Sequence, residues 1–94
     1  MKHRVERINS LIQEELAKIF LREMEFPAAL VTISRVETSD DMARAAVGLS
    51  VIPSGKSEEV LKLVNGNREL PMILAKNMAI KPMPKIVFEI DPHT

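Results

Sequence analysis

The sequence predicts an α+β domain in which helices pack on one face of a three-stranded sheet, with the element order α-β-β-α-α-β. Two observations predict this fold class. Several segments place apolar residues at spacings of three and four, which is typical of helices with one buried side. Other segments are β-branched or alternate between apolar and polar residues, which is typical of strands. Because a helical crossover joins the second and third strands, we expect a mixed sheet.

A first helix is predicted from Arg4 to about Glu25. Pro27 ends it, because the residue before a proline is disfavoured in the helical region of backbone space. The apolar residues of this segment fall on one stripe of the helix, and they are Val5, Ile8, Leu11, Ile12, Leu16, Ile19, Phe20 and Met24.

Two strands follow, and they are predicted to pair as a hairpin. Leu30–Thr38 is rich in β-branched residues, and Ser39–Asp41 has the composition of a turn. Residues 44–51 then alternate, so that the side chains of Ala45, Val47, Leu49 and Val51 share one face. The segment Pro53–Gly55 closes the hairpin.

A pair of helices leads to the last strand. Ser57–Glu59 opens the first of them with acids where the helix dipole favours negative charge, and Asn65-Gly66 is a stop signal. Helical spacing resumes from Leu70 to Met78. The segment Lys85–Asp91 is predicted as the final strand, with its apolar residues on one face.

The helix pair is predicted to be kinked near Gly66. Pro71 has no N–H, and in a straight helix its ring would clash with the carbonyl of Asn67. A straight helix would therefore lose roughly 3 kcal/mol at Pro71 and about 1 kcal/mol at Gly66. A break at Gly66-Asn67 avoids most of both penalties, and Asn67 can cap the following helix.

The charges are balanced in total and polarised along the chain. The formal net charge is zero, which taken alone counts against a nucleic-acid partner. Residues 62–85, however, hold five bases against one acid, a net of +4. A segment of this kind can turn a basic surface toward a polyanion, although chance scatter of charge over a solvated surface explains the same numbers.

No residue set predicts catalysis, a metal site or a cofactor. Gly55-Lys56-Ser57 lacks the earlier glycine of a phosphate-binding P-loop, since Ser50 stands in its place. Asp40-Asp41 is best interpreted as turn chemistry. His3 and His93 lie at opposite ends of the chain, and cysteine is absent. We therefore expect a protein that is not an enzyme.

A basic helix face is the strongest candidate for binding. Arg68, Met72 and Lys76 are spaced four apart, which places them on one side of a helix. Such a face suits an RNA groove, while a plain solvated helix face fits the spacing equally well. The aromatic residues are three phenylalanines, too few for base stacking, so contacts should be made to phosphates.

Short motifs spread over nearly the whole chain carry a further pattern. They are His3–Val5 and Glu25–Pro27 at the ends of the first helix, Val36–Asp41 followed by Met42, Ala43, Ala45, Val47 and Ser50, and Lys76–Met78 followed by Pro84–Phe88 and Asp91. In order and spacing these motifs resemble the ribosome-binding factor A family, whose members are bacterial assembly factors with a type II KH-like fold.

The resemblance implies a cytoplasmic protein that binds the immature small ribosomal subunit and its 16S rRNA late in maturation. It also implies a part in rRNA processing and in growth at low temperature, with an assembly GTPase as a candidate further partner. The family carries an Ala-x-Gly kink between its last two helices. In this chain either Gly66–Arg68 or Val64–Gly66 corresponds to that kink, depending on the register.

We expect residues 1–94 to form one monomeric RNA-binding domain that does not span a membrane. The predicted RNA-binding residues are Arg4, Arg7, Gly66, Asn67, Arg68, Lys76, Lys81 and Lys85. The main alternative is a protein-interaction or dimerisation module that uses the acidic first helix. A nucleotide-binding fragment built on Gly55–Ser57 is a minor alternative.

Overall fold

The computed structural model describes residues 2–80 and 83–91, and its elements follow the predicted order. The helices and strands are α1 (Lys2–Glu23), β1 (Leu30–Thr38), β2 (Arg44–Ile52), the short 3-10 helix η1 (Ser54–Lys56), α2 (Ser57–Gly66), α3 (Glu69–Met78) and β3 (Lys85–Ile90). No helix within these described ranges is both long and apolar enough to cross a membrane.

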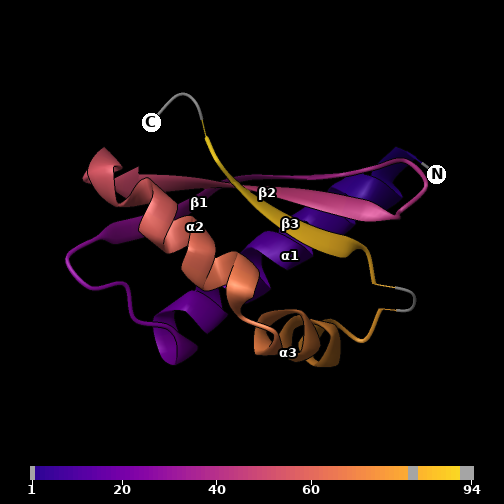
Figure 1. The fold of residues 1–94 in the computed structure, drawn as a ribbon. Helices are drawn as coiled ribbons and strands as arrows, with labels where there is room; N and C mark the ends of the chain where they lie inside the picture. The colour runs from indigo at the N-terminus through magenta and orange to yellow at the C-terminus, as the bar shows by residue number, and fades with distance from the viewer. Residues whose placement is uncertain (1, 81–82, 92–94) are drawn as a thin grey trace.

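The sheet has the order β1-β2-β3 and is mixed, as the helical crossover predicted. β1 pairs with β2 antiparallel, and β2 pairs with β3 in parallel. Figure 1 shows the three helices gathered on one side of this sheet, which leaves the other face uncovered. The α+β fold class is therefore confirmed.

The hydrophobic core lies between the sheet and the helices. The stripe predicted for the first helix supplies its side chains at Ile8, Ile12, Leu16 and Ile19, all buried. The inner face of β2 is buried along its whole length, from Ala45 to Val51. Each large apolar side chain buried in this way stabilises the fold by roughly 1.5–3 kcal/mol.

Helix α1 ends at Glu23, two residues before the predicted end at Glu25. The chain leaves the helix early because Phe26 packs its ring edge-on against Phe20, with centroids 5.3 Å apart. The N–H of Ala29 then donates to the carbonyl of Phe26 at 3.1 Å, and Ala28 takes a left-handed φ of 59°. Pro27 is thus accommodated in a turn, as its backbone restrictions require.

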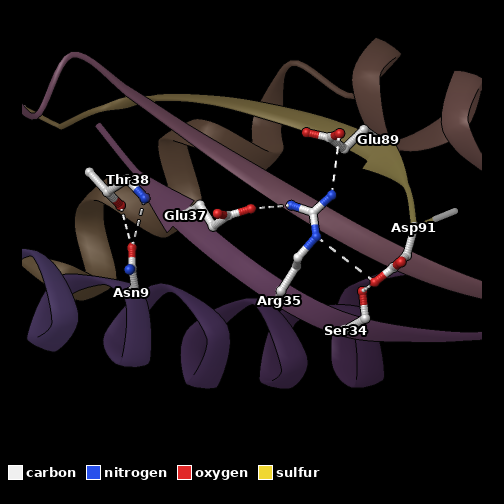
Figure 2. A network of polar contacts seen from close by, with 7 residues as sticks. All are labelled: Asn9, Ser34, Arg35, Glu37, Thr38, Glu89 and Asp91. Carbon is white, nitrogen blue, oxygen red and sulfur yellow. Dashed lines mark hydrogen bonds and ion pairs between the residues drawn. The ribbon is translucent and has the colours of Figure 1, made fainter. Parts of the chain in front are cut away.

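An asparagine side chain bonds to the backbone of each outer strand of the sheet. On β1, the N–H and the hydroxyl of Thr38 both donate to Oδ1 of Asn9, at 3.0 and 2.6 Å (Figure 2). On β3, the Asn65 side chain donates to the carbonyl of Phe88 and accepts from its N–H, both at 3.3 Å. These bonds satisfy backbone groups that an edge strand otherwise exposes to other chains.

Candidate nucleic-acid interface

The break between α2 and α3 lies at Asn67 and Arg68, next to the predicted position. Asn67 has extended backbone angles, φ −84° and ψ 102°. Its Oδ1 accepts from the N–H of Glu69 at 2.9 Å and from that of Leu70 at 3.2 Å, which is the bonding pattern of a helix N-cap. Pro71 falls in the first turn of α3, where a missing N–H costs little. The capping role predicted for Asn67 is confirmed.

The stop signal at Asn65-Gly66 is confirmed, but Gly66 does not use the left-handed backbone that glycine allows. It is the last residue of α2, and no glycine in the described residues has a positive φ. A β-carbon at Gly66 would meet no heavy atom within 4 Å. The geometry of the break therefore comes from Asn67 and Pro71, and it does not require a glycine at residue 66.

The Asn67 side chain also affects what this helix end can bind. Free N–H groups at a helix N-terminus attract phosphates. Two of those donors, on Glu69 and Leu70, are already bonded to Asn67. An incoming phosphate would have to displace this side chain, so the charged side chains nearby are the stronger candidates for contact.

Arg68, in helical conformation just before α3, and the exposed side of α3 form the basic face that the spacing predicted. Arg68 and Lys76 are exposed, and Met72 between them is 70% exposed. Neither cation has an ion-pair partner among the described residues. The opposite side of the helix is fixed in the core through Leu70 and Leu74. Met72 thus lies between two cations that have no ion-pair partner among the described residues, Arg68 just before α3 and Lys76 on it.

A cleft of about 280 Å³ lies between α1 and α3, at the end of this basic face. Three cations line it, Lys18 and Arg22 of α1 and Lys76 of α3, together with the carboxylates of Glu15 and Glu23. Lys18 is paired with Glu15 at 3.3 Å, whereas Arg22 has no ion-pair partner among the described residues. Sequence reasoning missed Arg22, because it joins Lys76 only through the packing of two helices far apart in the chain.

The other predicted residues lie elsewhere. Arg4 and Arg7 are exposed near the start of α1. At 1.5 Å per helical residue, Arg7 lies roughly 22 Å along the axis from Arg22, too far for the two to share one phosphate. Lys85 begins β3, at the edge of the sheet. Lys81 lies outside the described residues. The predicted set is therefore distributed over several places on the molecule.

The uncovered face of the sheet carries a charge network centred on Arg35 (Figure 2). Its guanidinium contacts Glu37 at 2.8 Å, Glu89 at 3.4 Å and Asp91 at 3.9 Å. Ser34 also donates its hydroxyl to Asp91 at 2.7 Å. Three carboxylates surround one guanidinium, so this part of the face is acidic and does not favour a polyanion.

Asp41, the second acid of the hairpin turn, has a structural role. Oδ1 of Asp41 accepts from the Ser39 hydroxyl at 2.7 Å and from the N–H of Ala43 at 3.0 Å. These two hydrogen bonds, the one from Ser39 first, hold the pKa of Asp41 below its ordinary value. Within the described part of the chain, no group of three metal-ligating side chains comes together.

The segment Gly55–Ser57 does not form a phosphate-binding loop. Gly55 and Lys56 belong to the 3-10 helix η1, and Ser57 begins α2 directly. The ammonium of Lys56 lies 3.8 Å from the carboxylate of Glu59. A P-loop needs an open arc of backbone N–H groups around the phosphates, and a continuous helical turn does not supply one.

Comparison with known proteins gives a consistent result. The family model described as ribosome-binding factor A matches residues 4–94. A ribosome-binding factor A of Pseudomonas paraeruginosa is 36% identical over 93 residues, which cover 94% of this chain and 73% of that protein. The Chlamydia pneumoniae protein of the same name is 32% identical over 95 residues, covering 94% of this chain and 78% of that one.

A solved structure supports the same assignment. The solution NMR structure of a Thermotoga maritima protein, described as a ribosome binding factor A, superposes with a TM-score of 0.63 at 29% sequence identity. The match covers 90% of this chain and 80% of that chain. Family model, relatives and fold agree, and the chain belongs to the ribosome-binding factor A family.

Proposed function

We propose that this protein binds the immature small ribosomal subunit and its 16S rRNA during late maturation, by binding and not by catalysis. The observation that carries the proposal is the exposed basic face formed by Arg68, just before α3, and Lys76 on α3, two cations with no ion-pair partner among the described residues. Membership of a family named for ribosome binding supports the ribosome as the partner.

The contacts would be made to phosphates and to groove shape, not to stacked bases. Phe20 and Phe88 are 7% and 5% exposed, and the half-buried Phe26 packs on Phe20, so the rings are engaged in packing. Met72 can lie against sugars at the centre of the basic face. Arg22 adds a further cation where the α1–α3 cleft opens beside Lys76.

Salt dependence follows from this mechanism. If about four phosphates are neutralised, log K should fall with log salt at a slope near −3 to −4. The measurement is a titration of purified protein against 16S rRNA between 50 and 200 mM salt. An affinity that stays constant over this range would exclude phosphate contacts as the source of binding.

Sedimentation of cell lysate tests the partner. The proposal predicts co-migration with free small subunits and absence from polysomes, because an assembly factor leaves before translation begins. The proposed function also implies a monomer in the cytoplasm that supports growth at low temperature. An assembly GTPase is a candidate for triggering its release from the subunit. Migration only at the top of the gradient would contradict the proposal.

A protein-interaction module is the second candidate, and one observation favours it. A mainly apolar groove of about 460 Å³ runs between α1 and β1. Leu21 and Leu30, which line it, are 89% and 62% exposed. Sedimentation equilibrium distinguishes this candidate in its dimerising form, since a dimer would show a mass that rises with protein concentration.

A further inference from the structure

Two cations stand side by side on the uncovered face of the sheet. Arg44 of β2 and Lys85 of β3 are direct partners in the parallel register. Both are exposed, and the residues that follow them, Ala45 and Ile86, turn inward to the core. Neighbouring strands lie about 4.8 Å apart, so the two side chains leave the same face from adjacent positions.

No ion pair neutralises these two cations within the part of the chain that the structure describes. In the turn before Arg44, the carboxylate of Asp41 accepts from Ser39 and Ala43 instead. The nearby carboxylates of Glu37, Glu89 and Asp91 are all engaged by Arg35. Neither Arg44 nor Lys85 forms an ion pair with any residue the structure describes. Like charges directly opposite one another destabilise a sheet. The fold therefore tolerates an electrostatic cost at this position that an anion would remove.

We propose that Arg44 and Lys85 together bind one phosphate of an RNA backbone. This inference rests on the proposed function and adds a second contact point, on the sheet face opposite the helices. The planar guanidinium of Arg44 can donate to two phosphate oxygens, and the ammonium of Lys85 supplies a mobile point charge.

The surroundings of the pair leave room for a nucleic-acid strand. The next outward residues along β2 are Ala46 and Gly48, which are small, and Val87 on β3 is an apolar side chain of moderate size. The acidic network around Arg35 begins beside them, since Glu37 is the β1 partner of Ala46 and Glu89 is the β3 partner of Gly48. An RNA backbone would therefore be attracted at the Arg44–Lys85 end and repelled farther along the face.

The thermal midpoint distinguishes a binding role of Arg44 and Lys85 from a role in supporting the fold. Replacing either cation by a neutral residue relieves repulsion in the free protein, so Arg44→Gln and Lys85→Gln should each raise the thermal midpoint by about 1–5 °C. The same substitutions should weaken RNA binding. A side chain that merely supported the fold would lower the thermal midpoint when replaced.

The test is a titration of the full chain against a 16S rRNA transcript at 50 and 200 mM salt, with thermal melting of each variant. Lys62→Gln is the matched control, since Lys62 is an exposed cation of α2 beside Glu25 and Glu59. Each lost phosphate contact should reduce the slope of log K against log salt by about 1. The ratio of variant to wild-type affinity should therefore change about three- to fourfold between 50 and 200 mM salt.

Two further variants sharpen the result. If both cations hold one phosphate, the double variant Arg44→Gln/Lys85→Gln should lose less affinity than the product of the two single losses. Arg44→Lys keeps the charge and should retain the salt slope while losing part of the affinity, because the forked donor is gone.

The outcomes separate the two proposals. A wild-type protein that binds neither the transcript nor immature subunits overturns the proposed function. A wild type that binds, with Arg44→Gln and Lys85→Gln indistinguishable from Lys62→Gln, overturns the phosphate site and leaves the proposed function standing. Lower thermal midpoints for both single variants would contradict the proposed repulsion between Arg44 and Lys85.

Discussion

The side chain of Arg35 lies directly over Gly48. A β-carbon at Gly48 would come within 2.9 Å of Cγ of Arg35, closer than such atoms approach in proteins. The missing side chain lets the guanidinium cross the central strand and reach Glu89 of β3 at 3.4 Å. A shift of register between Ile33 and Arg35 places β1 for this contact. One glycine thus allows an ion pair between the two outer strands.

Gly48→Ala should destabilise the protein by about 1–2 kcal/mol, because the new methyl group displaces Arg35 and strains the sheet. Chemical denaturation measures the change. Gly66→Ala is the control, since a β-carbon there meets nothing within 4 Å and alanine favours the helix. Equal stability of the two alanine variants would mean that Gly48 is not needed for the crossing.

Asn65→Ala should cost about 1–2 kcal/mol, because it removes both hydrogen bonds to the backbone of Phe88. Amide exchange at Phe88 should quicken at the same time. Asn77→Ala, on the exposed side of α3, makes the same change of helix propensity without an edge contact. Unchanged exchange at Phe88 in Asn65→Ala would show that the amide does not protect the edge of β3.

Asn67→Ala should destabilise the protein by about 1 kcal/mol, since the N–H groups of Glu69 and Leu70 lose their acceptor. Asn67→Asp should retain the stability because a carboxylate caps equally well, while its negative charge beside Arg68 should weaken RNA binding. Urea denaturation and RNA titration read the two effects separately. If Asn67→Ala is as stable as wild type, the Asn67 cap does not stabilise the break between α2 and α3.

The hairpin tip should respond to acid through Asp41. Its folded pKa is lowered from the ordinary value of 3.8 by the hydrogen bonds from Ser39 and Ala43. Its contribution is therefore present above pH 3.8 and is lost as the pH falls through the lower, folded pKa. The amide resonance of Ala43 should titrate with a midpoint below 3.8 in wild type and lose that transition in Asp41→Asn. A titration midpoint above 3.8 at Ala43 would contradict stabilisation of the ionised Asp41 by the two hydrogen bonds.

The sequence predicted most of the fold because local signals were strong. The apolar stripe of the first helix and the β-branched run Leu30–Thr38 correspond closely to α1 and β1. Pro71 and Asn67 located the break between α2 and α3 by backbone chemistry alone. The end of α1 was missed by two residues, since packing of Phe26 on Phe20 decided it.

The polar contacts could not be predicted in the same way. Asn9 and Asn65 bond to strands 29 and 23 residues away, so their roles exist only once the elements are placed. Arg22 joins Lys76 through the packing of α1 on α3. The pairing of Arg44 with Lys85 depends on the register of a parallel crossover, which residue spacing does not encode.

The proposed function requires that the basic face of Arg68 and α3 hold the protein on the immature small subunit. Crosslinking to immature subunits with Arg68→Glu/Lys76→Glu tests it most directly. Lys56→Glu/Lys62→Glu is the control that makes the same change of net charge at η1 and α2. Circular dichroism checks that Arg68→Glu/Lys76→Glu is folded. We expect this variant to lose crosslinks to 16S rRNA while the control variant keeps them. Crosslinking of the α3 variant at the wild-type level would contradict the claim.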